Sequence, residues 1–156
     1  MLGLKNANST EFDPSTPEPV ISELPEQKKV EMLGGTMRLG GQDVAIRPGT
    51  LAAHLYEGKR SVRERFRHRY EVDPAYIDRL AAAGMIFSGR HPQHPIMQFM
   101  ELRGPEQAGG HPFFVGGQFH PELTSRPLKP QPMFMGLMAA ALKRKHPDAD
   151  LGRWFR

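Results

Sequence analysis

The sequence contains no cysteine, and this absence excludes several kinds of site. A chain of 156 residues without thiols has no disulfide framework, no thiolate metal site and no thiol nucleophile of its own. The sequence also lacks an apolar run as long as a membrane span and an N-terminal segment laid out like a signal peptide. We therefore expect a soluble, cytoplasmic protein.

Apolar and aromatic residues are sparse, at 38% and 8% of the chain, whereas Pro (15) and Gly (16) are abundant. The length suits one domain with a core of its own. A high content of Pro and Gly favours many turns over a helical bundle. The composition therefore predicts a loop-rich single domain.

The net charge is small, +4, and the basic residues gather in segments 59–69 and 143–156. A nucleic-acid interface would need exposed aromatics among the basic residues, or a known binding module, and the sequence offers neither. We therefore favour a solvated helix face and a basic terminus over nucleic-acid binding.

Residues 116–127 carry the most specific chemical signal. They follow an apolar run at 113–115 that we predict to be a buried strand, and two glycines then permit close approach of the backbone. His120 and Glu122 are two residues apart, so on an extended segment both side chains point the same way. A carboxylate beside an imidazole fixes the ring tautomer while the ring takes a nucleophile's proton. The alternative is that both residues merely cap a turn.

Four segments resemble the class I glutamine amidotransferases, and specifically the CTP synthase family. In chain order they are residues 6–12 (NANSTEF), 33–40 (LGGTMRLG), 67–72 (RHRYEV) and 118–127 (QFHPELTSRP). They occur in the family's order and at roughly its spacing. One departure is Met97-Gln98, where the family has Val-Glu, which puts in doubt any contact made by that acid.

The resemblance implies an α/β, flavodoxin-like class I glutamine amidotransferase fold, incomplete because its N-terminal strands and nucleophile elbow are absent. It implies that His120 is the catalytic base and Glu122 its orienting acid. It also implies that Glu11 binds the α-amino group of substrate glutamine. Arg69 matches an arginine of the glutamine pocket, and a guanidinium can hold a carboxylate through two hydrogen bonds.

The family's nucleophile is a cysteine in a Gly-x-Cys-x-Gly turn that precedes the first of these segments, and its synthetase half precedes that. The resemblance therefore implies the rear part of a CTP synthase, whose glutaminase supplies ammonia for ATP-dependent amination of UTP. We expect no cofactor in this chain, since ATP and Mg would belong to the synthetase half. The expected partners are glutamine and the missing N-terminal half, or another copy of the chain. The alternative is a catalytically dead remnant, or a split subunit that only binds glutamine or a partner.

We predict a glutaminase part over residues 1–146 and a disordered basic tail over 147–156. The local patterns predict the following elements: a hairpin over 30–46 that turns at Gly40-Gly41, a helix over 51–56 capped by Thr50, a helix over 62–67 capped by Ser61, a strand over 68–72, a helix from Asp73 to Gly84, strands over 85–88 and 96–102, and an extended segment over 126–132.

A last helix is predicted from Met133 onward, ending at the basic residues 143–145. Its apolar stripe, which we expect to pack into the core, consists of Met133, Phe134, Leu137, Met138, Ala141 and Leu142. Three histidines beside prolines, His91, His94 and His111, are interpreted as loop residues and not as metal ligands.

Overall fold

The computed structural model describes residues 2–23, 38–108 and 110–151. The beginning of the predicted hairpin, residues 30–37, and the end of the predicted tail, residues 152–156, lie outside this part of the chain. The helices are α2 (Leu51–Leu55), α3 (Pro74–Ala82), α4 (Pro132–Lys145) and the 3-10 helix η2 (Pro121–Leu123). The strands are β1 (Ala7–Ser9), β2 (Glu18–Ser22), β3 (Arg38–Ile46), β4 (Ser61–His68), β5 (Glu71–Val72), β6 (Ile86–Arg90), β7 (Met97–Glu101) and β8 (Val115–Gly117).

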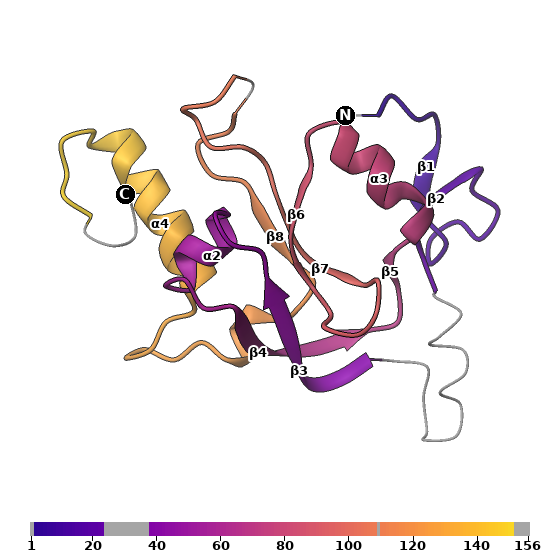
Figure 1. Cartoon of the computed structure of the whole chain (residues 1–156), viewed down its shortest axis with the longest axis horizontal. Helices are drawn as coiled ribbons and strands as arrows, with labels where there is room; N and C mark the ends of the chain where they lie inside the picture. The colour runs from indigo at the N-terminus through magenta and orange to yellow at the C-terminus, as the bar shows by residue number, and fades with distance from the viewer. Residues whose placement is uncertain (1, 24–37, 109, 152–156) are drawn as a thin grey trace.

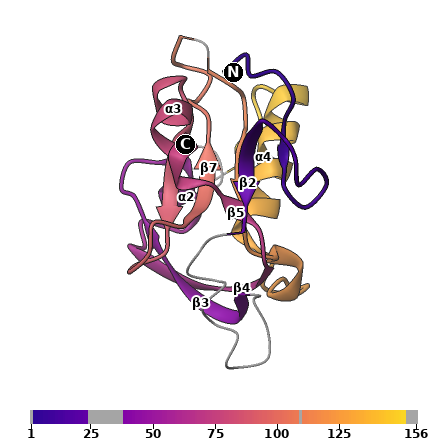
Figure 2. The ribbon, with the colours of Figure 1, turned by 90° about the vertical axis from the view of Figure 1, so that its right-hand side faces the viewer.

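The strands form two sheets. The larger has the order β4-β3-β6-β7-β8 and is antiparallel throughout, whereas the smaller has the order β1-β2-β5 with one parallel pair. Figure 1 places α2 and α4 at one end of the molecule and α3 with β1 and β2 at the other. Figure 2 shows this second end facing the viewer, with β2 beside β5.

The core lies where α2 packs on the larger sheet. Tyr56, Phe66, Phe99 and Phe119 supply its aromatic rings, all of them at most 5% exposed. Burial of such rings away from water is the main stabilising contribution that a small domain of this kind has.

The helix predicted over 62–67 is wrong, because these residues belong to strand β4. In β4, Val62, Glu64 and Phe66 point inward, while Arg63 and Arg65 are exposed. The alternation has the period of a strand, and the buried Glu64 disguises it because a carboxylate on the inner face reads as polar. The predicted basic helix face is therefore the outer face of a strand.

The predicted turn at Gly40-Gly41 is also wrong, because β3 runs straight through both residues. Gly40 lies opposite Phe66 and Gly41 opposite Arg65, so β3 pairs with β4 over eight residue pairs. A positive φ of 80° at Gly40 explains why glycine is present there, without any reversal of the chain.

Two helices begin as predicted. Thr50 accepts a hydrogen bond from Ala53 N at the start of α2, and Asp73 accepts one from Ala75 N at the start of α3. The predicted strands at 85–88 and 96–102 correspond to β6 and β7. The extended prediction for 126–132 needs correction, because Arg126 and Lys129 bridge each other around a tight turn.

Helix α4 forms where predicted, and Met133 packs against the core as expected, but most of the predicted apolar stripe faces outward. The helix buries its small residues Gly136, Ala139 and Ala140, while Phe134, Leu137, Met138 and Leu142 are 41–57% exposed. A Cβ at Gly136 would come within 2.5 Å of Leu55 and 2.9 Å of Phe113. The small residues therefore allow α4 to lie close against α2, and these four large apolar side chains are left uncovered. Of the described helices, none is both long and apolar enough to cross a membrane.

Candidate active site

The structure brings His120 and Glu122 into direct contact. His120 Nδ1 lies 2.6 Å from Glu122 Oε1. The prediction that the whole segment is extended needs correction. His120 has an extended backbone, but Glu122 lies in the first turn of η2. His120 makes no side-chain cap to η2, so the turn-capping alternative does not describe its side chain.

The chemistry of the pair fixes the imidazole tautomer. The pKa of Glu122 is lowered, first by a hydrogen bond from its own backbone N–H, then by the hydrogen bond to His120, with nearby Arg67 also contributing. An ionised carboxylate only accepts hydrogen bonds, so Nδ1 of His120 must donate. Nε2 is then the ring nitrogen that is free to take a proton.

Strand β4 holds the segment that carries this pair. His120 N donates to Arg65 O at 2.9 Å, and the His120 ring stacks on that of His68 with centroids 5.0 Å apart and planes 17° apart. Phe119, between Gln118 and His120 in the sequence, points into the core and contacts Phe66 and Phe99 edge to face. Alternation around Phe119 therefore places His120 on the side away from the core.

Gly117, one of the two glycines before this segment, lies close to side chains of the core. A Cβ at Gly117 would lie 2.7 Å from the ring of Phe119 and 3.2 Å from Met133 Sδ. Since Phe119 is 3% exposed, its ring cannot move aside. The close approach predicted for this segment is made to the protein's own core. The preceding strand, however, is β8 at Val115–Gly117 and not the predicted 113–115.

A buried polar network lies on the other side of the same segment. Glu64 accepts hydrogen bonds from Tyr56 Oη at 2.7 Å, Gln131 Nε2 at 2.9 Å and Thr124 Oγ1 at 3.2 Å. Burial and the Glu64 carboxylate raise the pKa of Tyr56, so its hydroxyl stays a donor. Gln131 also caps α4 through Met133 N. The network thus joins β4, α2, η2 and α4 around the His120 segment.

A cleft of about 550 Å³ contains the other two predicted site residues, Glu11 and Arg69. His120 does not line this cleft, but His68, on which it stacks, does. The remaining lining residues are Ser9, Phe12, Ile21, Arg67, Tyr70 and Gln118. One carboxylate and two guanidinium groups lining one cleft complement a molecule that carries both an ammonium and a carboxylate.

His68 and Gln118 are site neighbours that the sequence did not single out. Gln118 Nε2 donates to Tyr70 O at 2.9 Å, which connects the segment before His120 to the β4–β5 connection. Both residues lie within segments that carry the resemblance, 67–72 and 118–127. Their position in those segments was the one feature of the sequence that could have identified them as site residues.

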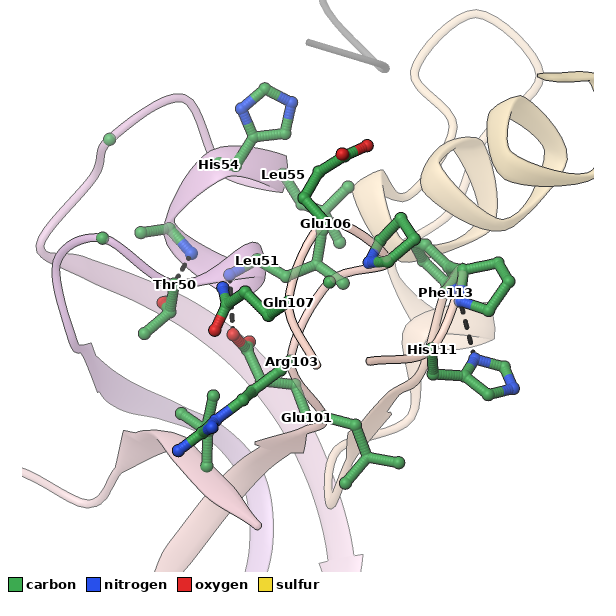
Figure 3. A pocket seen from close by; sticks show the side chains of 18 of the residues that line it. Thr50, Leu51, His54, Leu55, Glu101, Arg103, Glu106, Gln107, His111 and Phe113 are labelled. Carbon is green, nitrogen blue, oxygen red and sulfur yellow. Dashed lines mark hydrogen bonds between the residues drawn. The ribbon is translucent and has the colours of Figure 1, made fainter. Parts of the chain in front are cut away.

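A larger pocket, of about 1040 Å³, lies between α2 and the loop that follows β7 and contains none of the predicted site residues. Figure 3 shows Leu51 and Leu55 facing Phe113 across it. At its base, the buried Glu101 carboxylate accepts hydrogen bonds from Leu51 N at 2.7 Å and Ala52 N at 3.0 Å. Glu101 therefore satisfies the N-terminus of α2, where negative charge is favoured.

Within the described ranges, no three His, Asp or Glu residues gather as potential metal ligands. The rings of His91 and His94 lie 4.8 Å apart, and Nδ1 of His91 accepts a hydrogen bond from Gln93 N. His111 Nδ1 likewise accepts one from Phe113 N. His91 and His111 thus accept hydrogen bonds from the backbone of their own loops.

Residues 4–140 match the family described as glutamine amidotransferase class-I. The chain therefore belongs to the class I glutamine amidotransferase family, and its mixed α/β structure is that of this class of domain.

Its curated relatives are CTP synthases. That of Rubrobacter xylanophilus is 55% identical over 142 residues, covering 91% of this chain and 24% of the relative, and that of Thermus thermophilus is 52% identical over 147 residues. The chain thus spans about a quarter of the length of these relatives. The Trypanosoma brucei CTP synthase glutaminase domain, solved with bound acivicin, matches with a TM-score of 0.81 and 31% identity over 98% of this chain and 56% of that one.

Proposed function

We propose that the chain is the rear part of a CTP synthase glutaminase, which hydrolyses glutamine once a cysteine nucleophile is supplied. The observation that carries the proposal is the 2.6 Å contact between His120 and Glu122 at the start of η2, beside His68, which lines the cleft of Glu11 and Arg69. Since the sequence has no cysteine, the thiol has to come from residues outside these 156.

In the proposed reaction, Nε2 of His120 takes the thiol proton and the thiolate attacks the side-chain carbonyl carbon of glutamine. The proton then passes to the amide nitrogen, which leaves as ammonia, and a thioester remains. His120 next takes a proton from water, whose oxygen attacks the thioester carbonyl and expels the thiolate. The imidazolium then returns the proton to the sulfur, and glutamate is released. Glu122 keeps Nδ1 protonated throughout and stabilises the imidazolium that forms twice.

Glu11 and Arg69 are proposed to bind the backbone groups of glutamine. Glu11 pairs with the α-ammonium group, and Arg69 lies near the α-amino acid groups and can pair with the carboxylate. The two opposite charges lining one cleft select an α-amino acid over a simple amide, because an amide without these groups would leave both unpaired.

The proposed partner is the front part of the same glutaminase fold. The buried residue Gly136 of α4 lies against Leu55 and Phe113, which also line the apolar pocket beside α2, so the helix with the uncovered side chains adjoins this pocket. The solved glutaminase domain continues over the 44% of its length that this chain does not match (100% minus 56%). We propose that this remaining part covers α4 and brings the nucleophile. The ammonia then serves ATP-dependent amination of UTP in the synthetase half, where ATP and Mg belong.

Glutamine titration by calorimetry tests the proposal. Loss of one charge-assisted contact in Glu11→Ala or Arg69→Ala should weaken binding about 10- to 100-fold, since such bonds contribute about 1.5–3 kcal/mol. Glu106→Ala and Arg103→Ala are matched controls, because these residues line the larger pocket. Unchanged affinity in the Glu11 and Arg69 variants would contradict the assignment. If the chain binds no glutamine at millimolar concentration, the alternative of a catalytically dead remnant is favoured.

A further inference from the structure

The contact between His68 and His120 is the closest to parallel of the ring pairs in the described part of the chain. The planes differ by 17°, whereas the other pairs are tilted by 39° or more. His68 is the last residue of β4, and its Nε2 atom is buried. One face of the His120 ring is thus covered by a residue that is itself held in the structure.

His68 is supported from the core. Its ring meets Phe66 edge to face, with centroids 6.3 Å apart, and Phe66 is fully buried and meets Phe119 in the same manner. Rings in contact therefore run from the core through Phe66 and His68 to His120.

The single hydrogen bond to Glu122 does not by itself fix the plane of the His120 ring. The side chains of His120 and Glu122 are 34% and 57% exposed, so packing around the pair is incomplete. The backbone of His120 is held by Arg65 O, three residues before His68 on the same strand. What the hydrogen bonds leave undetermined is the tilt of the ring, and the stack on His68 restricts that tilt.

We propose that His68 is a positioning residue for His120, and that its stacked ring holds the imidazole in the plane in which Nδ1 meets Glu122 and Nε2 stays free. The proposal rests on the proposed function in that it assumes His120 acts as a base. The charged groups around the two rings are Glu122 beside His120, Arg67 close enough to act on Glu122, and Glu11 and Arg69, which line the same cleft as His68.

The test is NMR of the imidazole nitrogens of His120 in the full chain, without glutamine, at a pH where histidines are neutral. Native protein should show one tautomer, with Nδ1 protonated and Nε2 bare. In His68→Ala the two nitrogen shifts should move toward each other, since the ring samples both tautomers. In His68→Phe, which keeps an aromatic face, they should stay at the native positions. His94→Ala removes one ring of the other histidine pair and should leave His120 unchanged.

The methyl region of a proton spectrum of each sample shows whether the variant is folded. If the alanine variant unfolds, His68→Leu replaces His68→Ala. Native nitrogen shifts in a folded His68→Ala or His68→Leu variant would overturn the proposal. Changes in the nitrogen chemical shifts in His68→Phe as large as those in His68→Ala would also overturn it. They would show that an aromatic ring at position 68 is not enough to hold the His120 ring. Glutamine is absent from these samples, so failure here is distinct from failure of glutamine binding.

Discussion

At the scale of single residues, the carboxyl group of Glu122 reports on the proposed catalytic pair. Its pKa lies below the ordinary value, mainly because of its own backbone N–H and secondly because of His120. A group whose pKa is lowered by folding stabilises the fold fully above its unfolded pKa, and this contribution is lost as the pH falls through the folded pKa. The stability contributed by Glu122 is therefore lost only at acidic pH, as the carboxylate becomes protonated.

We predict that His120→Ala raises the pKa of Glu122 only part of the way to its ordinary value, since the backbone hydrogen bond remains. Titration of the side-chain carboxyl carbon by NMR measures this. His91→Ala, a change in a distant loop, serves as the control. A titration midpoint that does not move in His120→Ala would mean that the 2.6 Å contact is not formed in solution.

Two buried glutamines make a matched pair for stability. Gln98 is 1% exposed, and neither atom of its amide has a hydrogen-bond partner among the described residues, whereas Gln131, at 3% exposure, binds Tyr56, Glu64 and Met133. We predict that Gln98→Met raises the free energy of unfolding by about 1 kcal/mol and that Gln131→Met lowers it by about 1–3 kcal/mol. Denaturant unfolding measures both, and equal effects would show that Gln98 has partners in solution.

The sequence predicted the two residues of the pair because a short motif carries them, together with the caps Thr50 and Asp73. It did not predict the contacts that come from tertiary pairing. His68 stacks on His120 only because β4 and the 118–127 segment lie side by side, and neither segment alone contains that information.

At the scale of elements, β4 is the scaffold of the site and also the element that the sequence misassigned. Glu64, Arg65 and His68 each support the His120 segment, by a side-chain network, a backbone carbonyl and a stacked ring. A carboxylate on the inner face of a strand interrupts the apolar alternation from which strands are recognised. Glu64 therefore has two effects: its inward-facing carboxylate made β4 hard to recognise from the sequence, and it binds the segment that carries His120.

We predict that Glu64→Ala lowers the free energy of unfolding by about 2–3 kcal/mol, because the Tyr56 hydroxyl and the Gln131 amide lose their acceptor while remaining buried. Tyr56→Phe removes one donor but leaves the carboxylate bound by Gln131 and Thr124, so its cost should be smaller, about 1 kcal/mol. Urea unfolding compares the two. A smaller loss in Glu64→Ala than in Tyr56→Phe would rule out the carboxylate as the centre of the network.

At the scale of the whole molecule, the apolar surface of α4 is the main departure from a self-contained domain. The spacing of its large side chains predicted the helix correctly, but the direction of the stripe depends on what the helix packs against. Here the small residues Gly136, Ala139 and Ala140 are on the buried side, and Gly136 lies against Leu55 of α2. The sequence pattern describes a helix between two layers, and only one layer lies within the described residues.

We predict that the isolated chain is marginally stable and self-associates through this surface. The double variant Leu137→Lys, Met138→Lys should reduce association, measured by sedimentation velocity, without lowering the thermal midpoint, because both side chains are more than half exposed. Ala140→Lys, on the buried side of α4, is the destabilising control. A native chain that is monomeric with a sharp, cooperative thermal transition would refute the prediction.

The central claim is that this chain is the rear part of a working glutaminase, and a chimera tests it most directly. The matching 142-residue segment of the Rubrobacter xylanophilus CTP synthase is replaced by this chain, and glutamine-dependent glutamate release is measured with and without His120→Ala. Synthesis of CTP from added ammonium chloride verifies that the chimera is folded. The account predicts glutamine hydrolysis that His120→Ala lowers by about 10²–10⁴-fold. A folded chimera that uses ammonia but does not hydrolyse glutamine would contradict it.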